Sequence, residues 1–272
     1  MPIEATQPID DRYLNFGMVS IIMPNYNAAR FLNETIESVQ AQTYPDWELL
    51  FVDDCSTDDS IQKVREFAKK DPRIRVFQNE KNSGAAYSRN FALREAKGKW
   101  IAFLDSDDVW LPRKLEEQLT FMAQTGAKFS YTAFERIDEK SESLGTIITG
   151  PKKVSRRALF RYDYLGCLTV MYDAKTIGLV QVEESLKNRN DYAIWLKASK
   201  FADCFYLDRC LAKYRVRAGS ISHSGFKSKL KNQYRLFRVG EKKNAVSAAM
   251  CVAQNVFFGV LKKICYQKKT GQ

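Results

Sequence analysis

Residues 100–112 (WIAFLDSDDVWLP) constrain the fold of this chain most, because an apolar run ends there abruptly in three acids. The run over 100–104 has the length and composition of a buried β-strand. Asp105 and Asp107 are one residue apart, so in extended backbone their carboxylates point the same way. In an α/β chain, a strand with acids at its carboxyl end delivers them to the crevice where such sheets bind ligands.

Two interpretations of these acids follow from the residues alone. Like charges held close together are costly unless a cation joins them, and hard oxygen ligands suit Mg²⁺ or Mn²⁺. Mg²⁺ commonly takes one or two protein carboxylates and completes its shell with water and substrate phosphates, which predicts a metal–diphosphate site. The alternative is a solvated acidic turn that caps a helix beginning near Pro112.

The rest of the chain alternates apolar runs with amphipathic helical stretches. We expect buried strands over 19–23, 47–52, 74–78, 100–104 and 128–137, with single helices between them. Strands separated in this way predict right-handed βαβ units and a mostly parallel sheet. Ser56 or Thr57 is the expected cap of the helix that ends near Lys70.

The pattern is weaker after Asp138. We expect a loop or hairpin over 139–153, a helix over 191–200, and a pair of strands over 204–207 and 211–216.

The positive charge of the chain is concentrated in its last quarter. The formal net charge is +11, and residues 206–272 contain 15 Lys and Arg but only two acids. The uncharged stretch 244–261 is too short and too polar for a clear membrane span. Lysines lie at both ends of this stretch. Five of its apolar residues nevertheless share one helical face with Ile264: Val246, Met250, Ala253, Phe257 and Val260. We expect this helix to lie in the interface of an anionic membrane, and the alternative is packing on the body of the protein.

Two further features bear on the compartment. The six cysteines have no CxxC spacing and no histidine partners, which favours reduced thiols. The first 17 residues are polar and carry Glu4, Asp10 and Asp11, unlike a secretory signal. We therefore expect a cytoplasmic protein that is at most peripheral on the cytoplasmic face of a membrane.

Polar residues follow three of the expected strands at one edge of the sheet. PNYN (24–27) follows the first strand, Asp53 and Asp54 follow the second, and Asp105 and Asp107 follow the fourth. A nucleotide crevice needs an aromatic ring to stack on a base, a carboxylate to accept from a ring N–H, and a cation site for a diphosphate.

Three segments carry a resemblance to a known family: IIMPNYNAARFLNETIESVQAQTYPDWELLFVDDCSTDDS, NSGAAYSRNFAL and GKWIAFLDSDDVWLP. They resemble the inverting GT-A glycosyltransferases of family two, of the bacterial surface-polysaccharide type. The match is dense over 19–135 and returns at NDYAIWL (190–196), which is similar to the acidic segment with the family's catalytic base. YRVR (214–217) resembles the closing strand.

The resemblance implies an α/β fold of the GT-A class, a Rossmann-like, mostly parallel sheet flanked by helices. It implies a nucleotide-sugar-binding half over 18–135. Residues 136–240 would form the acceptor-binding and catalytic-base region of the same domain. Residues 241–272 would form a basic amphipathic helical tail.

The resemblance also implies how the donor's nucleoside is bound. Pro24 and Tyr26 would line the nucleoside pocket, and Asn27 would shape the loop. Asp54 would accept from the uracil N3–H, with Asp53 beside it. Considered alone, Tyr26 is better explained by loop packing, and the two acids could instead cap a helix.

The remaining roles concern the diphosphate and the chemistry. Arg89 would approach the diphosphate or hold the loop, and Asp105 would contact the ribose or the metal shell. Asp107 would be the principal ligand of Mn²⁺ or Mg²⁺, and Asp191 would be the base. Asp191 also begins a helix, where an acid is stabilising without any catalytic duty.

The sequence departs from the family pattern at two positions. Asn190 stands where Glu is common, and Arg217 stands where many members have a histidine near the metal. A guanidinium cannot coordinate a cation but can clamp phosphate, so the strength of the metal dependence stays open.

The implied function is inverting transfer of one hexosyl or N-acetylhexosaminyl group from a nucleotide-diphosphate sugar, taken to be UDP-linked. The acceptor would be a hydroxyl of a glycan or lipid-linked acceptor in surface-polysaccharide biosynthesis, such as lipopolysaccharide. Asp191 would remove the hydroxyl proton, and the metal would neutralise the leaving diphosphate.

Other classes lack their motifs. A sugar nucleotidyltransferase needs a Gly-rich loop after the first strand, and the loop 24–30 has no glycine; GxxxxGK[ST] and GxGxxG do not occur. A nucleic-acid-binding protein is the non-enzyme alternative, but no recognised motif accompanies the basic tail, so we expect no nucleic-acid partner. QYRLF (233–237) lacks the processive QxxRW pattern, which predicts one sugar per acceptor.

Overall fold

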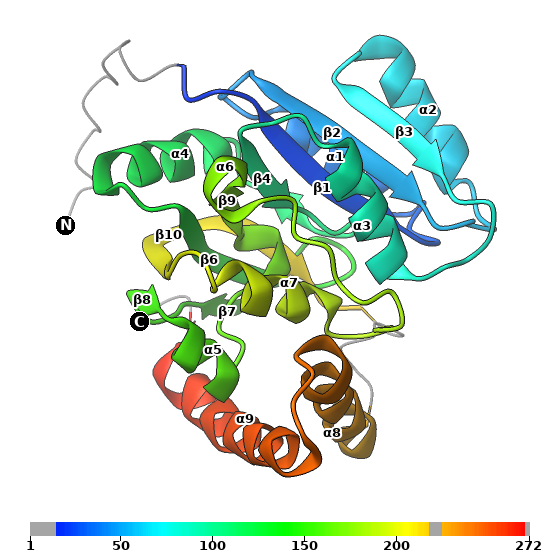
Figure 1. Cartoon of the computed structure of the whole chain (residues 1–272). Helices are drawn as coiled ribbons and strands as arrows, with labels where there is room; N and C mark the ends of the chain where they lie inside the picture. The colour runs from blue at the N-terminus through cyan, green and yellow to red at the C-terminus, as the bar shows by residue number, and fades with distance from the viewer. Residues whose placement is uncertain (1–14, 218–224, 270–272) are drawn as a thin grey trace.

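The computed structural model describes residues 15–217 and 225–269. Glu4, Asp10 and Asp11 therefore lie outside the described residues. Within these ranges the strands join into one mixed sheet with helices on both faces (Figure 1). This confirms the predicted α/β class.

The elements follow one another as the alternating sequence pattern predicts. The strands are β1 (Val19–Asn25), β2 (Trp47–Asp53), β3 (Ile74–Gln78), β4 (Trp100–Phe103), β5 (Val109–Trp110), β6 (Phe129–Ile137), β7 (Ser143–Ile148), β8 (Lys153–Val154), β9 (Met171–Asp173), β10 (Cys204–Arg215) and β11 (Gln267–Lys269). The helices are α1 (Leu32–Gln40), α2 (Ser60–Lys70), α3 (Ala85–Glu95), α4 (Lys114–Thr125), α5 (Arg156–Arg161), η2 (Cys167–Thr169), α6 (Ala174–Ile177), α7 (Asn190–Ala198), α8 (Phe226–Arg235), η4 (Leu236–Gly240) and α9 (Ala245–Cys265).

The sheet has the order β11-β7-β6-β9-β4-β1-β2-β3, with β10 paired to β5, β6 and β8. Strands β4, β1, β2 and β3 are parallel, so their carboxyl ends share one edge. Strand β9 is antiparallel to both of its neighbours, β4 and β6. All residues of β1 and β2 are buried, as expected for parallel strands covered on both faces.

Two hydrophobic cores cover the two faces of the sheet. Ile21 and Met23 of β1 pack in the core that α1, α2 and α4 close. Ile22, which points the opposite way, packs in the other core, with α3, α5 and α7. The centre of that second core is aromatic: Trp195 meets Phe103 edge-on, with the ring centroids 4.9 Å apart. The helix that carries Asp191 is therefore fixed directly on the sheet.

Two sequence expectations about local structure were wrong. Helix α2 begins at Ser60 and is not capped by Ser56 or Thr57. The Ser56 hydroxyl donates to Asp53 at the end of β2, and the Thr57 amide donates to Asn27 in the loop after β1, so both residues are held away from the helix. The expected pair of strands is a single strand, β10, with bulges between Leu207 and Ala212. The segment between these two residues has no glycine or proline to make a turn, and bulges absorb the extra residues.

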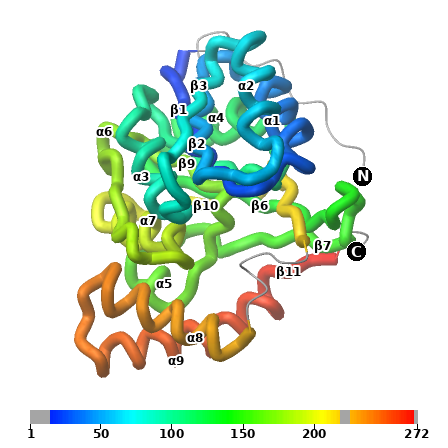
Figure 2. The backbone as a smooth tube through the Cα atoms, turned by 90° about the vertical axis from the view of Figure 1, so that its right-hand side faces the viewer, coloured from blue at the N-terminus to red at the C-terminus, as the bar shows by residue number. Residues whose placement is uncertain are grey.

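The C-terminal helices lie together on the side of the molecule away from β1–β3 (Figures 1 and 2). Helix α9 packs on the body through small and polar residues: Ala248, Cys251 and Asn255 are buried. Asn255 Nδ2 donates to the carbonyl of Phe160 at 3.1 Å. A Cβ at Gly259 would lie 2.9 Å from the ring of Tyr162, so only glycine allows this close approach.

Helix α9 leaves its large apolar residues exposed. Val246, Phe257 and Ile264 have exposed fractions of 71%, 62% and 73%. The helix has 21 residues, more than the uncharged stretch suggested, and by length and composition it could cross a membrane. However, β11 follows it and pairs with β7, so both ends of α9 join the same body. An amphipathic helix that packs through its small and polar side and exposes its apolar side is unusual for a protein in water.

Candidate active site

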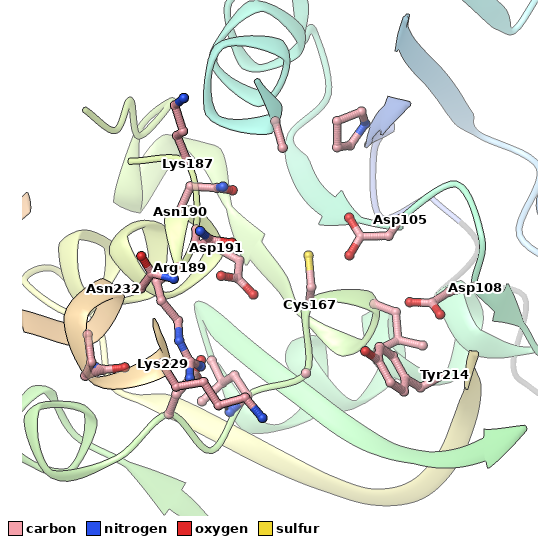
Figure 3. A pocket seen from close by; sticks show the side chains of 18 of the residues that line it. Asp105, Asp108, Cys167, Lys187, Arg189, Asn190, Asp191, Tyr214, Lys229 and Asn232 are labelled. Atoms are coloured by element: carbon pink, nitrogen blue, oxygen red, sulfur yellow. Dashed lines mark hydrogen bonds between the residues drawn. The ribbon is translucent and has the colours of Figure 1, made fainter. Parts of the chain in front are cut away.

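A cleft of about 1170 Å³ begins at the carboxyl edge of β1, β2 and β4 and extends to α8 and α9 (Figure 3). It is lined by eight of the residues predicted from the sequence. On the nucleotide side these are Pro24, Tyr26, Asn27 and Asp54. The others are Arg89, Asp105, Asp107 and Asp191. Pro24 and Asp191, about 170 positions apart in the numbering, thus share one cavity with α8 and α9.

The loop after β1 presents an aromatic ring to the cleft. Tyr26 is 48% exposed, although its neighbour Asn25 is buried. Asn27 has a positive φ of 50°, and its side-chain oxygen accepts from the Thr57 amide at 2.8 Å. Its own amide donates to the Ser56 hydroxyl at 2.9 Å. These bonds join the β1 and β2 loops and hold Tyr26 at the surface of the cleft.

Asp54 is a buried acceptor at the end of β2. Its carboxylate accepts from Asn79 Nδ2 and the Ser83 amide, both at 2.8 Å, and from the Gly84 amide at 2.7 Å. Gly84 has a φ of 90°, which favours glycine, at the start of α3. An ionised carboxylate has about four acceptor positions, so one remains for a donor in the cleft.

The structure does not bring Asp53 to the cleft. Its side chain is fully buried and accepts from Asn25 Nδ2 at 2.8 Å and from the Ser56 amide at 2.9 Å. Asp53 and Asp54 are adjacent in an extended segment, so their side chains point to opposite sides. The expectation that Asp53 binds the nucleotide beside Asp54 is corrected: Asp53 holds the loop, and of these two acids only Asp54 lines the cleft.

Arg89 connects the two halves of the cleft. It is buried on α3 and donates both to Asp105, after β4, and to the side-chain oxygen of Asn190, at the start of α7. Burial alone would lower the pKa of Arg89, but the charges of Asp105 and Asp191 raise it above its usual value. Arg89 therefore stays charged and fixes the helix that carries Asp191 relative to the strand that ends before Asp105.

The acids after β4 form a tight negative cluster. Burial and the charge of Asp105 raise the pKa of Asp107, and Arg217 Nε, 2.6 Å from Asp107 Oδ2, opposes that rise. Asp108 is fully buried; its Oδ1 accepts from the Arg215 amide at 2.9 Å, while Oδ2 has no hydrogen-bond partner in the described chain. Burial, Asp107 and Asp105 raise its pKa well above the usual range.

This cluster fits a divalent cation that is held by few protein ligands. No group of three or more His, Cys, Asp or Glu side chains in the described ranges could enclose a metal ion. Asp105 and Asp107 keep part of their side chains exposed to the cleft, 32% and 17%. Mg²⁺ and Mn²⁺ accept one or two carboxylates when a substrate diphosphate and water complete the shell.

Asp191 lies in the first turn of α7, on the far side of the cleft from Asp105 (Figure 3). Within the described ranges, its Oδ1 accepts a hydrogen bond from the backbone amide of the next residue, Tyr192, at 2.8 Å. Arg189, just before the helix, has a positive φ of 61°. Asp163 lies near Asp191, and burial together with the Asp191 charge raises the pKa of Asp163 to about 7.

Sequence reasoning missed Arg189 and Asp163. Both lie where the sequence pattern is irregular, between the end of α5 and the start of α7. No periodic or motif signal marks them, because they reach the cleft only through the packing of α7 and the loop after α5.

Comparisons with known proteins identify the family of this chain. The family model described as glycosyl transferase family 2 matches residues 20–177. TuaG of Bacillus subtilis (strain 168), named for teichuronic acid biosynthesis, is 37% identical over 248 residues, 91% of this chain and 98% of that protein. The UDP-Glc:alpha-D-GlcNAc-diphosphoundecaprenol beta-1,3-glucosyltransferase WfgD of Escherichia coli is 39% identical over 222 residues, 80% of this chain and 84% of that protein.

Solved structures show the same fold. TarS 1-349 of S. aureus in complex with UDP has a TM-score of 0.66 and 22% identity, over 88% of this chain and 70% of that one. A mannosyltransferase from Pyrobaculum calidifontis in complex with GDP-Man and Mn²⁺ has a TM-score of 0.60 and 15% identity, over 91% and 81%. The chain belongs to glycosyl transferase family 2. It is a glycosyltransferase with the GT-A fold, as the resemblance in its sequence implied.

Proposed function

We propose that this chain transfers one sugar, with inversion, from a UDP-linked donor to a hydroxyl of a lipid-linked glycan acceptor in surface-polysaccharide biosynthesis. The observation that carries the proposal is one cleft with an exposed aromatic ring, Tyr26, and a carboxylate, Asp54, at one end and the Asp191 carboxylate across from them. Residues 18–135 supply the donor side and 136–240 the base, and Arg89 joins the two.

The donor fits the nucleotide end of the cleft. Tyr26 offers an exposed ring for a base, and Asp54 has one acceptor position left for a ring N–H. Relatives named for UDP-Glc and solved structures with UDP and UDP-GlcNAc support the choice of UDP. Mn²⁺ or Mg²⁺, held by Asp107 with Asp105, would supply positive charge to the diphosphate that leaves. Arg217 places a guanidinium at the same position.

The chemistry needs one base and no nucleophile. Asp191 would accept the proton of the acceptor hydroxyl while that oxygen attacks the anomeric carbon from the face opposite the diphosphate. An α-linked donor then gives a β-linked product. Arg89 holds Asp105 on one side of the cleft and Asn190 on the other. Donor and acceptor would therefore react in a fixed relative orientation and not by random collision.

The acceptor side points to a membrane. Relatives are named for a diphosphoundecaprenol acceptor. Helix α9, which lines the cleft, exposes an apolar stripe on its outer side. Lys242 and Lys243 precede that stripe, as expected for a helix in the interface of an anionic leaflet. At the other end, Lys262 donates to backbone carbonyls of the body and Lys263 lines the cleft. We place the enzyme in the cytoplasm, peripheral on the cytoplasmic face of the membrane. A nucleic-acid partner is not part of this proposal.

A panel of sugar nucleotides tests the proposal. The full-length protein is screened by thermal shift with and without Mn²⁺, and ligands that bind are then incubated with a lipid-linked glycan acceptor. A ligand at 100 times its Kd stabilises the folded protein by about 2.7 kcal/mol, a shift of several degrees. We expect UDP-sugars to stabilise it and one of them to yield a single-sugar, inverted product. Stabilisation by no sugar nucleotide, or formation of a nucleoside triphosphate and a sugar phosphate when pyrophosphate is supplied in place of the acceptor, would overturn the proposal.

A further inference from the structure

The end of the cleft beyond Asp191 is basic. Arg189, before α7, Lys229 of α8 and Lys263 of α9 all line it. Figure 3 shows Arg189 and Lys229 on the side of Asp191 that faces away from Asp105. In the part of the chain that the structure describes, none of these three cations forms an ion pair with an acid.

The nearby acids do not balance this charge. Asp163 and Asp191 are the acids that line this end of the cleft. A fourth cation, Lys262, already donates to the backbone carbonyls of Asp163 at 3.2 Å and of Tyr164 at 3.3 Å. Arg189 and Lys262 both act on the charge of Asp163, whereas Lys229 and Lys263 face no acid, so this end of the cleft has more positive than negative groups among the described residues.

A neutral donor on the same wall also lacks a partner. Gln233 of α8 lines the cleft and is 5% exposed, and its Nε2 is buried without a hydrogen bond in the described ranges. A buried donor that stays unpaired is destabilising by about 1–3 kcal/mol. This second observation is independent of the charge, and it favours a ligand with an acceptor atom in the same space.

The wall continues outward as an apolar surface. Val252, Val256 and Val260 of α9 line the cleft, and Val260 is 58% exposed. Phe257, on the same helix, is 62% exposed. A ligand that fills this end therefore meets cations and an amide donor inside, and hydrocarbon towards the outside.

We propose that Arg189, Lys229, Lys263 and Gln233 bind the diphosphate of a lipid-linked glycosyl diphosphate acceptor. The lipid leaves the cleft along α9, and the sugar of the acceptor lies against Asp191. The cleft thus has two anion sites. The donor diphosphate lies at Asp107 and Arg217, and the acceptor diphosphate lies on the other side of Asp191. This inference rests on the proposed function and names the acceptor site within it.

Binding to the full-length protein tests the site without turnover. The probe is N-acetylglucosaminyl diphosphate with an undecyl chain, compared by calorimetry with the undecyl glycoside that lacks phosphate and with inorganic pyrophosphate. We expect the diphosphate lipid to bind at least 10-fold more tightly than either. Equal binding of the phosphate-free glycoside would overturn the diphosphate site, and equal binding of pyrophosphate would overturn the lipid-linked ligand.

Variants locate the site. Lys229→Gln with Lys263→Gln is expected to weaken probe binding by 10-fold or more and to raise the acceptor KM, with UDP binding unchanged. Lys227→Gln with Lys231→Gln, on exposed positions of α8 outside the cleft, is the matched control. Unchanged probe binding in the first pair would overturn the assignment. If the first pair of substitutions weakened probe binding while the wild-type protein transferred sugar from no sugar nucleotide, the acceptor site would be supported and the proposed function refuted.

Discussion

Arg217 Nε lies 2.6 Å from Oδ2 of Asp107, so the carboxylate expected to hold a metal already has a cation of the protein beside it. The pair is partly buried, with side-chain exposures of 30% and 17%. A guanidinium cannot coordinate ligands as a metal does, but it can donate hydrogen bonds to two phosphate oxygens at once. Under the proposed function, the donor diphosphate would therefore meet positive charge whether or not a metal is bound.

Replacing Arg217 is expected to change the metal requirement. Arg217→Ala removes the cation that competes for Asp107, so Mn²⁺ should bind more tightly, by up to about fivefold for a partly exposed ion pair. Calorimetric titration of Mn²⁺ in the presence of UDP measures this. Arg209→Ala, which breaks the ion pair with Glu117, is the control. A weaker Mn²⁺ affinity in Arg217→Ala would show that the guanidinium supports the metal instead of competing with it.

Asp107→Ala is expected to abolish transfer and to weaken metal-dependent UDP binding while the fold stays intact. The variant removes a carboxylate whose burial beside Asp105 is unfavourable, so stability should not fall. Turnover and UDP affinity with Mn²⁺ are the measurements, with Asp59→Ala at an exposed position as the control. Normal turnover of Asp107→Ala in Mn²⁺ would mean that the metal is held elsewhere.

Asp191→Asn should retain donor binding and lose turnover, because an amide cannot accept the proton of the acceptor hydroxyl. General-base catalysis contributes about 10²–10⁴-fold, and kcat should fall by that much or more. Asp203→Asn, at an acid paired with Lys153 and not among the residues of the cleft, should keep its activity. If Asp191→Asn works within a few-fold of wild type, another group is the base.

The exposed stripe of α9 is expected to bind anionic vesicles. Replacing Val246, Phe257 and Ile264 by Ser together should weaken binding to vesicles that contain phosphatidylglycerol, while UDP binding remains. Each Lys or Arg near the leaflet contributes about 1 kcal/mol, so wild-type binding should weaken with salt, and apolar burial should keep it from vanishing. Phe201→Ser, with an exposed fraction of 60% at that position, is the control. Equal vesicle binding by all three proteins, or by none, would exclude this membrane role.

Asp163 is expected to make stability depend on pH. Its pKa is about 7 in the folded protein against 3.8 ordinarily, because of burial and Asp191, with Lys262 and Arg189 opposing. Between these values the folded protein keeps a proton that the unfolded chain has lost. The contribution of Asp163 to the free energy of unfolding is therefore full below pH 4 and is lost as pH rises to about 7.

Urea unfolding of wild type and Asp163→Asn measures this contribution as a difference between the two proteins. The difference should shift in favour of the variant from pH 4 to pH 7 and level off above that. A difference that is flat across this range would show that Asp163 titrates normally.

The short-range pattern of the chain determined the class of fold and much of the cleft. The apolar run over 100–104 predicts a strand from its composition alone, and Asp105 follows it by the order of the chain. Because parallel strands share an edge, Tyr26 and Asp54 were expected beside Asp105 without any structure, and all three line the cleft.

Only the tertiary structure decided which way individual side chains face. Asp53 and Asp54 are adjacent acids, but the bonds of Asn25 and Ser56 hold the first inside the loop. The contacts of Arg89 with Asn190 and of Asp107 with Arg217 join residues about a hundred positions apart, and no local pattern specifies such pairs.

Helix α9 shows the same division between sequence and structure. Its sequence determined that Val246, Phe257 and Ile264 share one face, because an α-helix repeats every 3.6 residues. Which face packs on the body depends on the surface it meets. Asn255 donates to the carbonyl of Phe160, and Gly259 lies close to the ring of Tyr162. These two contacts turn the small and polar side of α9 to the body and leave its apolar side outward. Periodicity is a property of the chain, whereas the partner of each face is set only when distant segments pack together.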